Sequence, residues 1–152
     1  MGAVYFYHLT RRPLEAVLPQ LLERALAQGW RVSLRARTDA MLDRLDDALW
    51  TDPPDGFLPH ARDGGPQDAA QPILLTLGET VPEGRDCLIC VEGAPMAAAE
   101  VAALARGCVI FDGGDAAALA QARDQWRALT GAGVAAQYWS EESGQWQKKA
   151  ER

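Results

Sequence analysis

Two absences restrict where this chain acts. Its 152 residues contain no apolar run near the length of about 18 residues that a membrane-spanning helix needs. The N-terminal segment MGAVYFYHLT lacks the basic region and the long apolar region of a secretory signal peptide. We therefore predict no membrane span and no cleaved signal peptide, and we expect a cytoplasmic protein.

Cysteine is scarce as well, with three residues in the chain. A small and odd number argues against a secreted disulfide framework and for a reducing compartment. Cys87 and Cys90 form a C-x-x-C, but they lie in an apolar run that predicts a strand, where residues three apart point to opposite faces. The two thiols would diverge, and no second pair of ligands accompanies them. We predict no metal site, and we interpret these cysteines and Cys108 as small core residues.

Basic charge is also limited. The chain has 15 Lys+Arg against 21 Asp+Glu, which gives a formal net charge of -6 and a pI of about 4.9. Binding along a phosphate backbone requires a basic surface, so we expect any contact with nucleic acid to be indirect. With 48% hydrophobic residues the composition is that of an ordinary globular domain, and the length allows a core that needs no disulfide or metal.

Hydrophobic periodicity predicts strands that alternate with helices. Apolar and β-branched runs predict strands at 3–9, 30–36, 72–77, 86–92, 107–111 and 134–139. Apolar stripes at spacings of three and four predict helices at 14–28, 39–50, 95–105 and 116–129. We expect Thr10 to cap the first helix and Asp115 to cap the last, while Thr38 or Asp39 caps the second. Residues 51–71, rich in Pro and Gly, predict a long loop without regular structure, which is usually functional or mobile.

This alternation predicts the fold class. Several strands are wholly apolar, which indicates a mainly parallel sheet with helices on both faces. There is no internal repeat and no domain boundary before the last strand. We predict a single three-layer α/β/α domain, Rossmann-like but without nucleotide motifs, over residues 1–139, followed by a polar C-terminal extension over residues 140–152 that contains Trp146.

An α/β domain suggests nucleotide binding, and a nucleotide-binding α/β enzyme of unknown substrate is the alternative function. Neither G-x-G-x-x-G nor G-x-x-x-x-G-K-[ST] occurs, and the turn Asp112–Asp115 places two carboxylates where a phosphate would lie. A G-x-S-x-G nucleophile elbow is also missing, and the chain has only two histidines, His8 and His60. We therefore expect no catalytic residues and no cofactor.

The last predicted helix carries the most specific surface. The residues that can share one of its faces, at spacings of three and four, are Asp115, Leu119, Ala122, Arg123, Trp126 and Arg127. Two guanidinium groups beside an indole suit an anionic peptide that ends in an aromatic residue. The ring would lie against Trp126 and Leu119, and an arginine would hold a carboxylate. The alternative is an ordinary helix surface on which Arg123 pairs with Asp124 or Asp115.

Other aromatic residues stand outside the core pattern. Trp50 and Phe57 bracket the prolines that open the long loop, and Tyr138, Trp139 and Trp146 lie near the C-terminus. Large aromatics of this kind anchor protein-binding patches, although each of them could instead close an edge of the core.

Several segments together resemble the chi subunit family of bacterial DNA polymerase III. The resemblance spans residues 3–139, and its most specific part is a helix ending in Asp-Asp-Ala-Leu-Trp that is followed seven residues later by Phe-Leu-Pro-His. The segments that carry it are Tyr5–Leu9, Leu45–Trp50, Phe57–His60, Val109–Asp112, Trp126–Leu129 and Tyr138–Trp139.

The resemblance implies a non-catalytic adaptor within the DNA polymerase III holoenzyme. Chi subunits have an α/β fold similar to nucleotide-binding and helicase domains but without the nucleotide motifs. They link the clamp loader, through the small psi subunit, to the acidic C-terminal tail of single-stranded DNA-binding protein, which ends in an aromatic residue with a free carboxylate. On the clamp-loader side, the candidate partners are psi or an equivalent clamp-loader component. A helicase-like protein is a further candidate partner for the surface around Phe57.

Residue by residue, the resemblance implies two binding surfaces. For the tail, Arg123 matches the arginine that meets the carboxylate, Trp126 the aromatic wall and Arg127 its basic neighbour. The chain departs from the family at Leu119, a position that can be basic, and at Asp112, one that can be apolar. For psi, the matching residues are Trp50 and Phe57, with Pro59 and His60 adjacent. The extension after residue 139 departs from shorter family members.

Overall fold

The computed structural model describes residues 2–51, 58–78 and 80–152. Strands and helices alternate through most of the chain, at or near the predicted positions. The elements in chain order are β1 (Ala3–Leu9), α1 (Leu14–Ala27), β2 (Val32–Arg35), α2 (Asp39–Thr51), β3 (His60–Arg62), the 3₁₀ helix η1 (Asp68–Ala70), β4 (Ile73–Thr76), β5 (Cys87–Cys90), α3 (Ala98–Ala102), β6 (Arg106–Asp112), α4 (Ala116–Gly131), β7 (Ala135–Ser140) and β8 (Gln147–Glu151).

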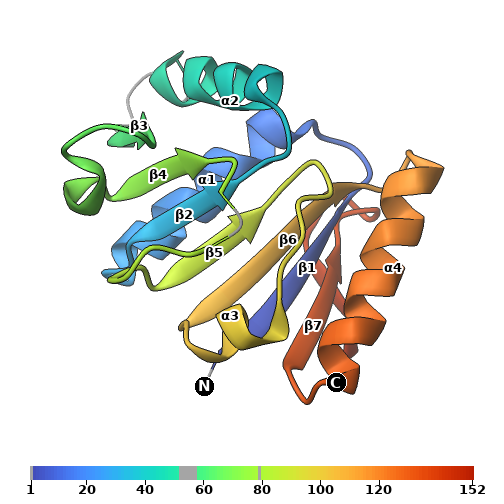
Figure 1. Ribbon diagram of the computed structural model, residues 1–152. Coiled ribbons are helices and arrows are strands. Elements are labelled where there is room, and N and C mark those ends of the chain that lie inside the picture. Colours follow the sequence, from blue (N-terminus) through green and yellow to red (C-terminus); the bar gives the residue numbers. More distant parts are fainter. Residues whose placement is uncertain (1, 52–57, 79) are drawn as a thin grey trace.

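The strands form one sheet in the order β3-β4-β2-β5-β6-β1-β7-β8. Every neighbouring pair is parallel except β7 with β8, which is antiparallel. Helices α1 and α2 cover one face of the sheet, and α3 and α4 cover the other (Figure 1). The prediction of a three-layer α/β domain with a mainly parallel sheet is therefore confirmed.

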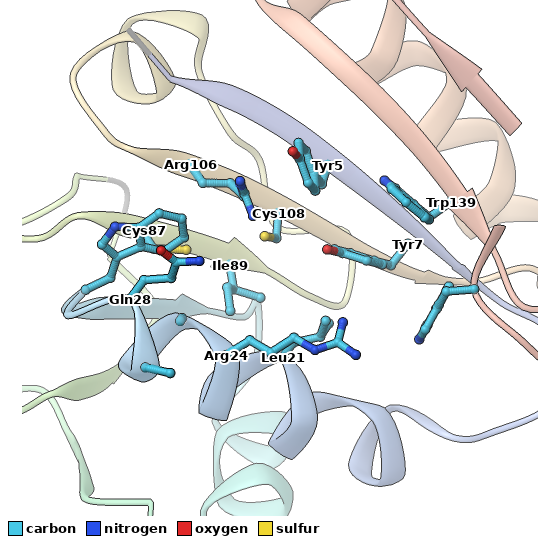
Figure 2. Close-up of a pocket in the computed structure, with 14 residues that line it drawn as sticks. Tyr5, Tyr7, Leu21, Arg24, Gln28, Cys87, Ile89, Arg106, Cys108 and Trp139 are labelled. Carbon is cyan, nitrogen blue, oxygen red and sulfur yellow. The ribbon is translucent and has the colours of Figure 1, made fainter. Parts of the chain in front are cut away.

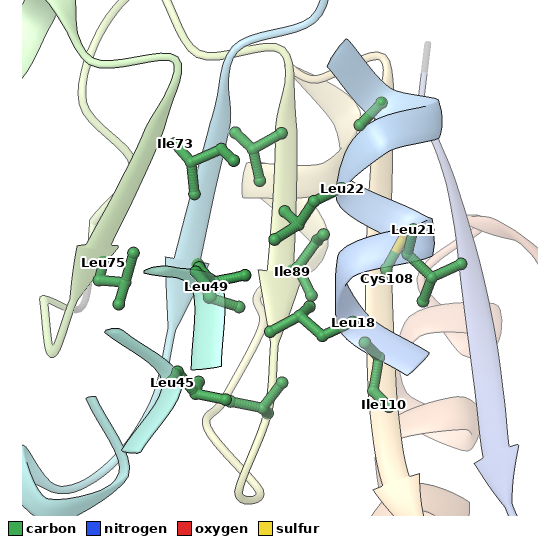
Figure 3. Packing of buried hydrophobic residues seen from close by; sticks show 14 of the residues in the cluster. Leu18, Leu21, Leu22, Leu45, Leu49, Ile73, Leu75, Ile89, Cys108 and Ile110 are labelled. Carbon is green, nitrogen blue, oxygen red and sulfur yellow. The ribbon is translucent and has the colours of Figure 1, made fainter. Parts of the chain in front are cut away.

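The core is split by the sheet into two clusters. On the α1 and α2 face, helix leucines such as Leu18, Leu22 and Leu45 pack on Ile73 and Ile89 from the strands (Figure 3). Each fully buried leucine or isoleucine contributes about 1.5–3 kcal/mol to folding. On the α3 and α4 face, the second cluster is built around Val4, Phe6, Leu88, Val101, Val109 and Leu129. This two-sided burial explains why the central strands are continuous apolar runs.

The cysteines lie as their spacing predicted. Cys87 belongs to the cluster under α1, and Cys90 belongs to the cluster on the opposite face, so the C-x-x-C does diverge. Cys108 lies on the same face as Cys87. All three are free and buried, and burial raises the pKa of Cys90 to about 12, so its thiol stays protonated. The described residues contain no group of three His, Cys, Asp or Glu side chains arranged to hold a metal ion.

The first helix does not use the predicted cap. Pro13 is the N-cap residue of α1, its backbone is extended with φ of -70°, and it makes no side-chain capping bond. Thr10 lies three residues earlier, so that prediction is wrong. Proline suits a helix start because it lacks the N–H that would otherwise be left unbonded there and because its φ is already fixed.

Within the segment 51–71, the described residues 58–71 are more ordered than the composition predicted. They include β3, which pairs with β4, and η1. This order depends on hydrogen bonds and not on a periodic pattern of apolar residues. The guanidinium of Arg85, which is 94% buried, donates to the backbone carbonyls of Asp68 and Gln71 at 2.6 and 2.5 Å. The charged side chain of Arg85 thus holds in place the residues around Asp68 and Gln71, a stretch that has few apolar residues of its own.

The extension after residue 139 joins the sheet. Its strand β8 pairs with β7, with an irregularity between Tyr138 and Trp139, and Trp146 packs edge-on against Tyr7 with ring centroids 5.2 Å apart. Strand β8 is exposed along its whole length and carries both lysines of the chain, which discourages edge-to-edge pairing with another sheet. No helix in the described ranges is long and apolar enough to cross a bilayer.

Candidate functional site

Helix α4 is held in a fixed rotation over the sheet. Asp115 is its N-cap, as predicted, and its carboxylate accepts hydrogen bonds from the backbone N–H groups of Ala117 and Ala118 at 2.9 and 3.2 Å. Ala122 and Leu129 are buried against the strands. The predicted tail-binding residues on α4 are therefore held in a defined direction relative to the sheet.

The four predicted tail-binding residues divide by burial. Leu119 and Trp126 are half-buried and pack against the cluster under α4, whereas Arg123 and Arg127 are exposed. Apolar side chains at the base and guanidinium groups at the rim form a surface with one apolar and one cationic part. Such a surface can hold a ring and an oxyanion of the same ligand.

Strand residues extend the apolar part into an aromatic wall. The Trp126 ring meets Phe6 and Tyr138 edge-on, with ring centroids 5.4 and 6.1 Å apart. The ring centroids of Tyr138 and Phe111 are 6.0 Å apart. Residues of β1, β6, β7 and α4 therefore form the wall. The sequence pattern predicts only the α4 residues of this group and does not place Phe111 or Tyr138 with them.

His8 is the polar member of this wall. Its Nδ1 lies 2.6 Å from the Tyr138 hydroxyl, and its ring packs against Phe111 with centroids 5.1 Å apart. The ring also lies against Gly113, where a β-carbon would collide with the imidazole and with the carbonyl of Leu9. Glycine at position 113 is therefore required for His8 to take this place.

Electrostatics link Arg123 to the same group of side chains. Burial lowers the pKa of His8, and the charge of Arg123 lowers it further, while Glu142 and Asp112 act in the opposite direction. Burial raises the pKa of Tyr138, and Arg123 opposes that rise. The guanidinium thus acts on a neutral imidazole and a neutral phenol.

The two arginines on α4 differ in their partners. Arg127 lies 3.5 Å from Asp124, one turn away, and both side chains are more than 70% exposed, so this pair is weak. Arg123 forms no ion pair with any residue in the described part of the chain. The alternative in which Arg123 pairs with Asp124 or Asp115 is therefore not what the structure contains.

A second candidate surface lies at the opposite end of the sheet, where α2 ends and β3 begins. Trp50 is 60% exposed, and its ring lies 4.6 Å from that of the buried His60. The Nδ1 of His60 lies 2.7 Å from the carbonyl oxygen of Leu58, and its Nε2 lies 2.9 Å from the carboxylate of Asp46 but without hydrogen-bond geometry. Pro59 is half-buried beside it, and Phe57 lies outside the described residues.

The carboxyl ends of the strands, where α/β folds bind nucleotides, hold a cavity of about 750 Å³. Its helix N-termini already carry carboxylates of the chain. Glu92 accepts from the backbone N–H groups of Arg37 and Thr38 at 2.9 Å, and Asp115 caps α4. Glu15 in the first turn of α1 forms a bidentate pair with Arg44 at 2.6 and 2.8 Å. At α2 and α4, backbone N–H groups that could bind a phosphate are thus bonded to acidic side chains.

Comparison with known proteins agrees with the family suggested by the sequence. The sequence profile of the family described as "DNA polymerase III chi subunit, HolC" matches residues 1–137. A protein of Pseudomonas aeruginosa named DNA polymerase III subunit chi is 37% identical over 70 residues, which are 46% of this chain and 48% of that relative. This match spans about half the length of the relative. The chain belongs to the family of the DNA polymerase III chi subunit.

Proposed function

We propose that this chi-family chain is a non-catalytic adaptor of DNA polymerase III. On one side it binds the acidic C-terminal tail of single-stranded DNA-binding protein, and on the other it binds psi or an equivalent clamp-loader component. Neither surface requires chemistry, because the function is to hold two partners together. The observation that carries the proposal is that Arg123, which has no ion-pair partner among the described residues, lies beside the aromatic wall of Trp126, Phe111 and Tyr138.

The tail would bind through its last residue. Its free carboxylate would accept two parallel N–H bonds from Arg123, a geometry that guanidinium matches better than an ammonium group does. Its aromatic ring would lie against Trp126 and Leu119, which are half-buried and so already ordered. Arg127 would attract the acidic residues that precede the terminus, and this attraction would weaken with added salt.

Two departures from the family pattern shape this site. Burial lowers the pKa of His8 at the edge of the aromatic wall, and the negative charge of the exposed Asp112 opposes this shift. The same negative charge would repel an acidic tail. Leu119 offers apolar contact where the family can supply a positive charge. We expect this site to depend more on ring burial and less on charge than a family member with a basic residue there.

The second surface would bind the clamp-loader partner through Trp50. An indole that is 60% exposed and packed against the buried ring of His60 is an anchor of the kind that dominates protein interfaces. Phe57, Pro59 and His60 would complete the contact. The tail surface and this surface lie at opposite ends of the sheet, so both partners could bind at once.

Calorimetric titration with the last ten residues of the cognate single-stranded DNA-binding protein tests the tail surface. We expect micromolar binding, lost when the terminal aromatic residue is removed. Arg123→Ala should weaken binding by about 1.5–3 kcal/mol, the range for a hydrogen bond to a charged group. Arg37→Ala, which removes an exposed arginine near the start of α2, is the matched control and should bind like the wild type. A loss below twofold for Arg123→Ala would exclude Arg123 from the site.

Trp50→Ala tests the second surface. The side chain is mostly exposed, so its loss should not unfold the protein. We expect weaker binding to psi or its equivalent in a pull-down, with tail binding unchanged. Equal loss at both surfaces would indicate damage to the fold, and unchanged binding of the clamp-loader component would exclude Trp50 from that contact.

A further inference from the structure

A second cleft lies on the face of the sheet opposite α4, between α1 and strands β5, β6, β1 and β7 (Figure 2). Its volume is about 380 Å³, within the range of pockets that hold small molecules rather than folded partners. Its floor is formed by Ile89, Cys87 and Cys108, and Tyr7 of β1 and Trp139 of β7 point toward it.

One arginine in this cleft is positioned by aromatic rings. The guanidinium carbon of Arg106 lies 4.0 Å from the centroid of Tyr5 and 5.0 Å from that of Trp30. Two rings therefore hold the cation in place through cation–π contacts, which use none of its N–H donors. Its Nε is buried without a hydrogen-bond partner, and within the described residues Arg106 forms no ion pair.

A second arginine adds to the positive charge. Arg24, in the last turn of α1, also lines the cleft and has no ion-pair partner in the ranges that the structure describes. Among the residues that the structure describes, no aspartate or glutamate lines the cleft, although the chain as a whole has a net charge of -6. Two unpaired guanidinium groups without a carboxylate make this cleft a local exception to the acidic charge of the protein.

The remaining walls are flat and apolar. Trp139 is half-buried and its indole N–H already donates to Gln137 at 3.1 Å, so its ring is held in place. Trp146 closes the outer side and contacts Tyr7 edge-on. A planar ring can pack between such surfaces, because aromatic pairs favour offset or edge-on contact.

We propose that this cleft is a binding site for a small aromatic anion, a molecule that joins a planar ring to a carboxylate or a phosphate. The oxyanion binds Arg106 and Arg24, and the ring packs against Trp139 and Tyr7. The sheet separates this site from the α4 surface, so the two sites are independent. A nucleotide and an aromatic acid share this chemistry, and the probes distinguish them.

The five tryptophans report on the site by their indole N–H signals in a nitrogen–proton correlation spectrum of the full chain. Trp30, Trp139 and Trp146 line the cleft, whereas Trp50 and Trp126 do not and act as internal controls. The probes are deoxyadenosine monophosphate and phenylacetate. Inorganic phosphate and benzyl alcohol are controls that each lack one half of the ligand. We expect saturable shifts of the three cleft signals with at least one probe, and the more tightly bound probe identifies the anion.

Variants separate binding from folding. Arg106→Gln should weaken probe binding by roughly tenfold or more, the size expected for a lost hydrogen bond to a charged group, and Arg106→Lys should restore only part of it. Arg24→Gln, at an exposed position, gives a second measurement in a variant that keeps the core intact. Arg123→Ala should bind the probes normally. Shifts confined to Trp126, equal shifts with inorganic phosphate alone, or no shift with either probe would overturn the proposal.

Discussion

Removal of Glu100 should destabilise the protein strongly, because it leaves a buried cation without its partner. Arg35 on β2 is 98% buried, and its guanidinium forms a bidentate pair with Glu100 of α3 at 2.7 and 3.0 Å. It also donates to the carbonyl of Pro95 at 2.8 Å. Truncation of one partner of a buried pair costs about 3–5 kcal/mol. Because the Glu100 side chain is 17% exposed, we place Glu100→Ala at the lower end, about 3 kcal/mol.

Urea unfolding followed by tryptophan fluorescence measures this cost, which should lower the midpoint by about 1–3 M. The exposed pair of Glu15 and Arg44 is the control, since its closest contact is as short, 2.6 Å, but its side chains are 31% and 52% exposed. Glu15→Ala should cost less than about 1 kcal/mol. Equal costs for the two variants would show that burial does not set the strength of these pairs and would refute the reasoning.

A double variant and the pH dependence test the same cause. Arg35→Met combined with Glu100→Met removes both charges and should recover most of the stability that Glu100→Ala loses. The bond from Arg35 lowers the pKa of Glu100 although burial opposes it. A carboxyl with a lowered folded-state pKa stabilises above its unfolded pKa and loses that contribution as the pH falls. The difference between wild type and Glu100→Ala should therefore shrink in acid.

Three further predictions concern the α4 surface. Gly113→Ala should cost about 1–3 kcal/mol in urea unfolding, because its β-carbon would collide with His8, whereas Gly131→Ala, with open space around it, should be neutral or stabilising. Asp112→Asn should strengthen tail binding about two- to fivefold in calorimetry, the effect of removing one exposed like charge, and weaker binding would contradict the repulsion argued above. Tail affinity should rise as the pH falls from about 8 to 5, because protonation of His8 adds a positive charge beside Arg123; His8→Gln should abolish this rise.

The sequence predicts elements better than it predicts which of them meet. The apolar run at 86–92 and the N-cap Asp115 correspond closely to β5 and α4, because each is specified by its own local pattern. Residues 30–36 alternate between apolar and polar side chains, yet all four residues of β2 are buried, including Ser33 and Arg35. Burial of Arg35 depends on Glu100, which lies 65 positions away, and no local pattern signals it.

The aromatic wall shows the same limit. Strand β1 pairs with both β6 and β7, which places His8 opposite Phe111 and Phe6 opposite Tyr138. The α4 face could be predicted because helix geometry alone brings Leu119, Arg123 and Trp126 together. The strand residues join it only through the order of the strands in the sheet, which sequence periodicity does not determine.

The helix N-termini at the strand ends bear on the proposed binding of the tail to the side of α4. In nucleotide-binding α/β domains these N-termini bind the ligand's phosphate through backbone N–H groups. Here Glu92 takes that place at α2, and its backbone is left-handed with φ of 58°, an uncommon conformation outside glycine that places its carboxylate on the helix end. Asp115 occupies the corresponding position at the N-terminus of α4.

Because these backbone donors are already bonded, an incoming carboxylate would have to be held by a side chain. Arg123 is the α4 arginine whose charge is not shared with a neighbouring aspartate in the described chain. In the proposed complex, a guanidinium on the side of α4, and not a set of backbone donors at a helix N-terminus, would hold the carboxylate of the tail.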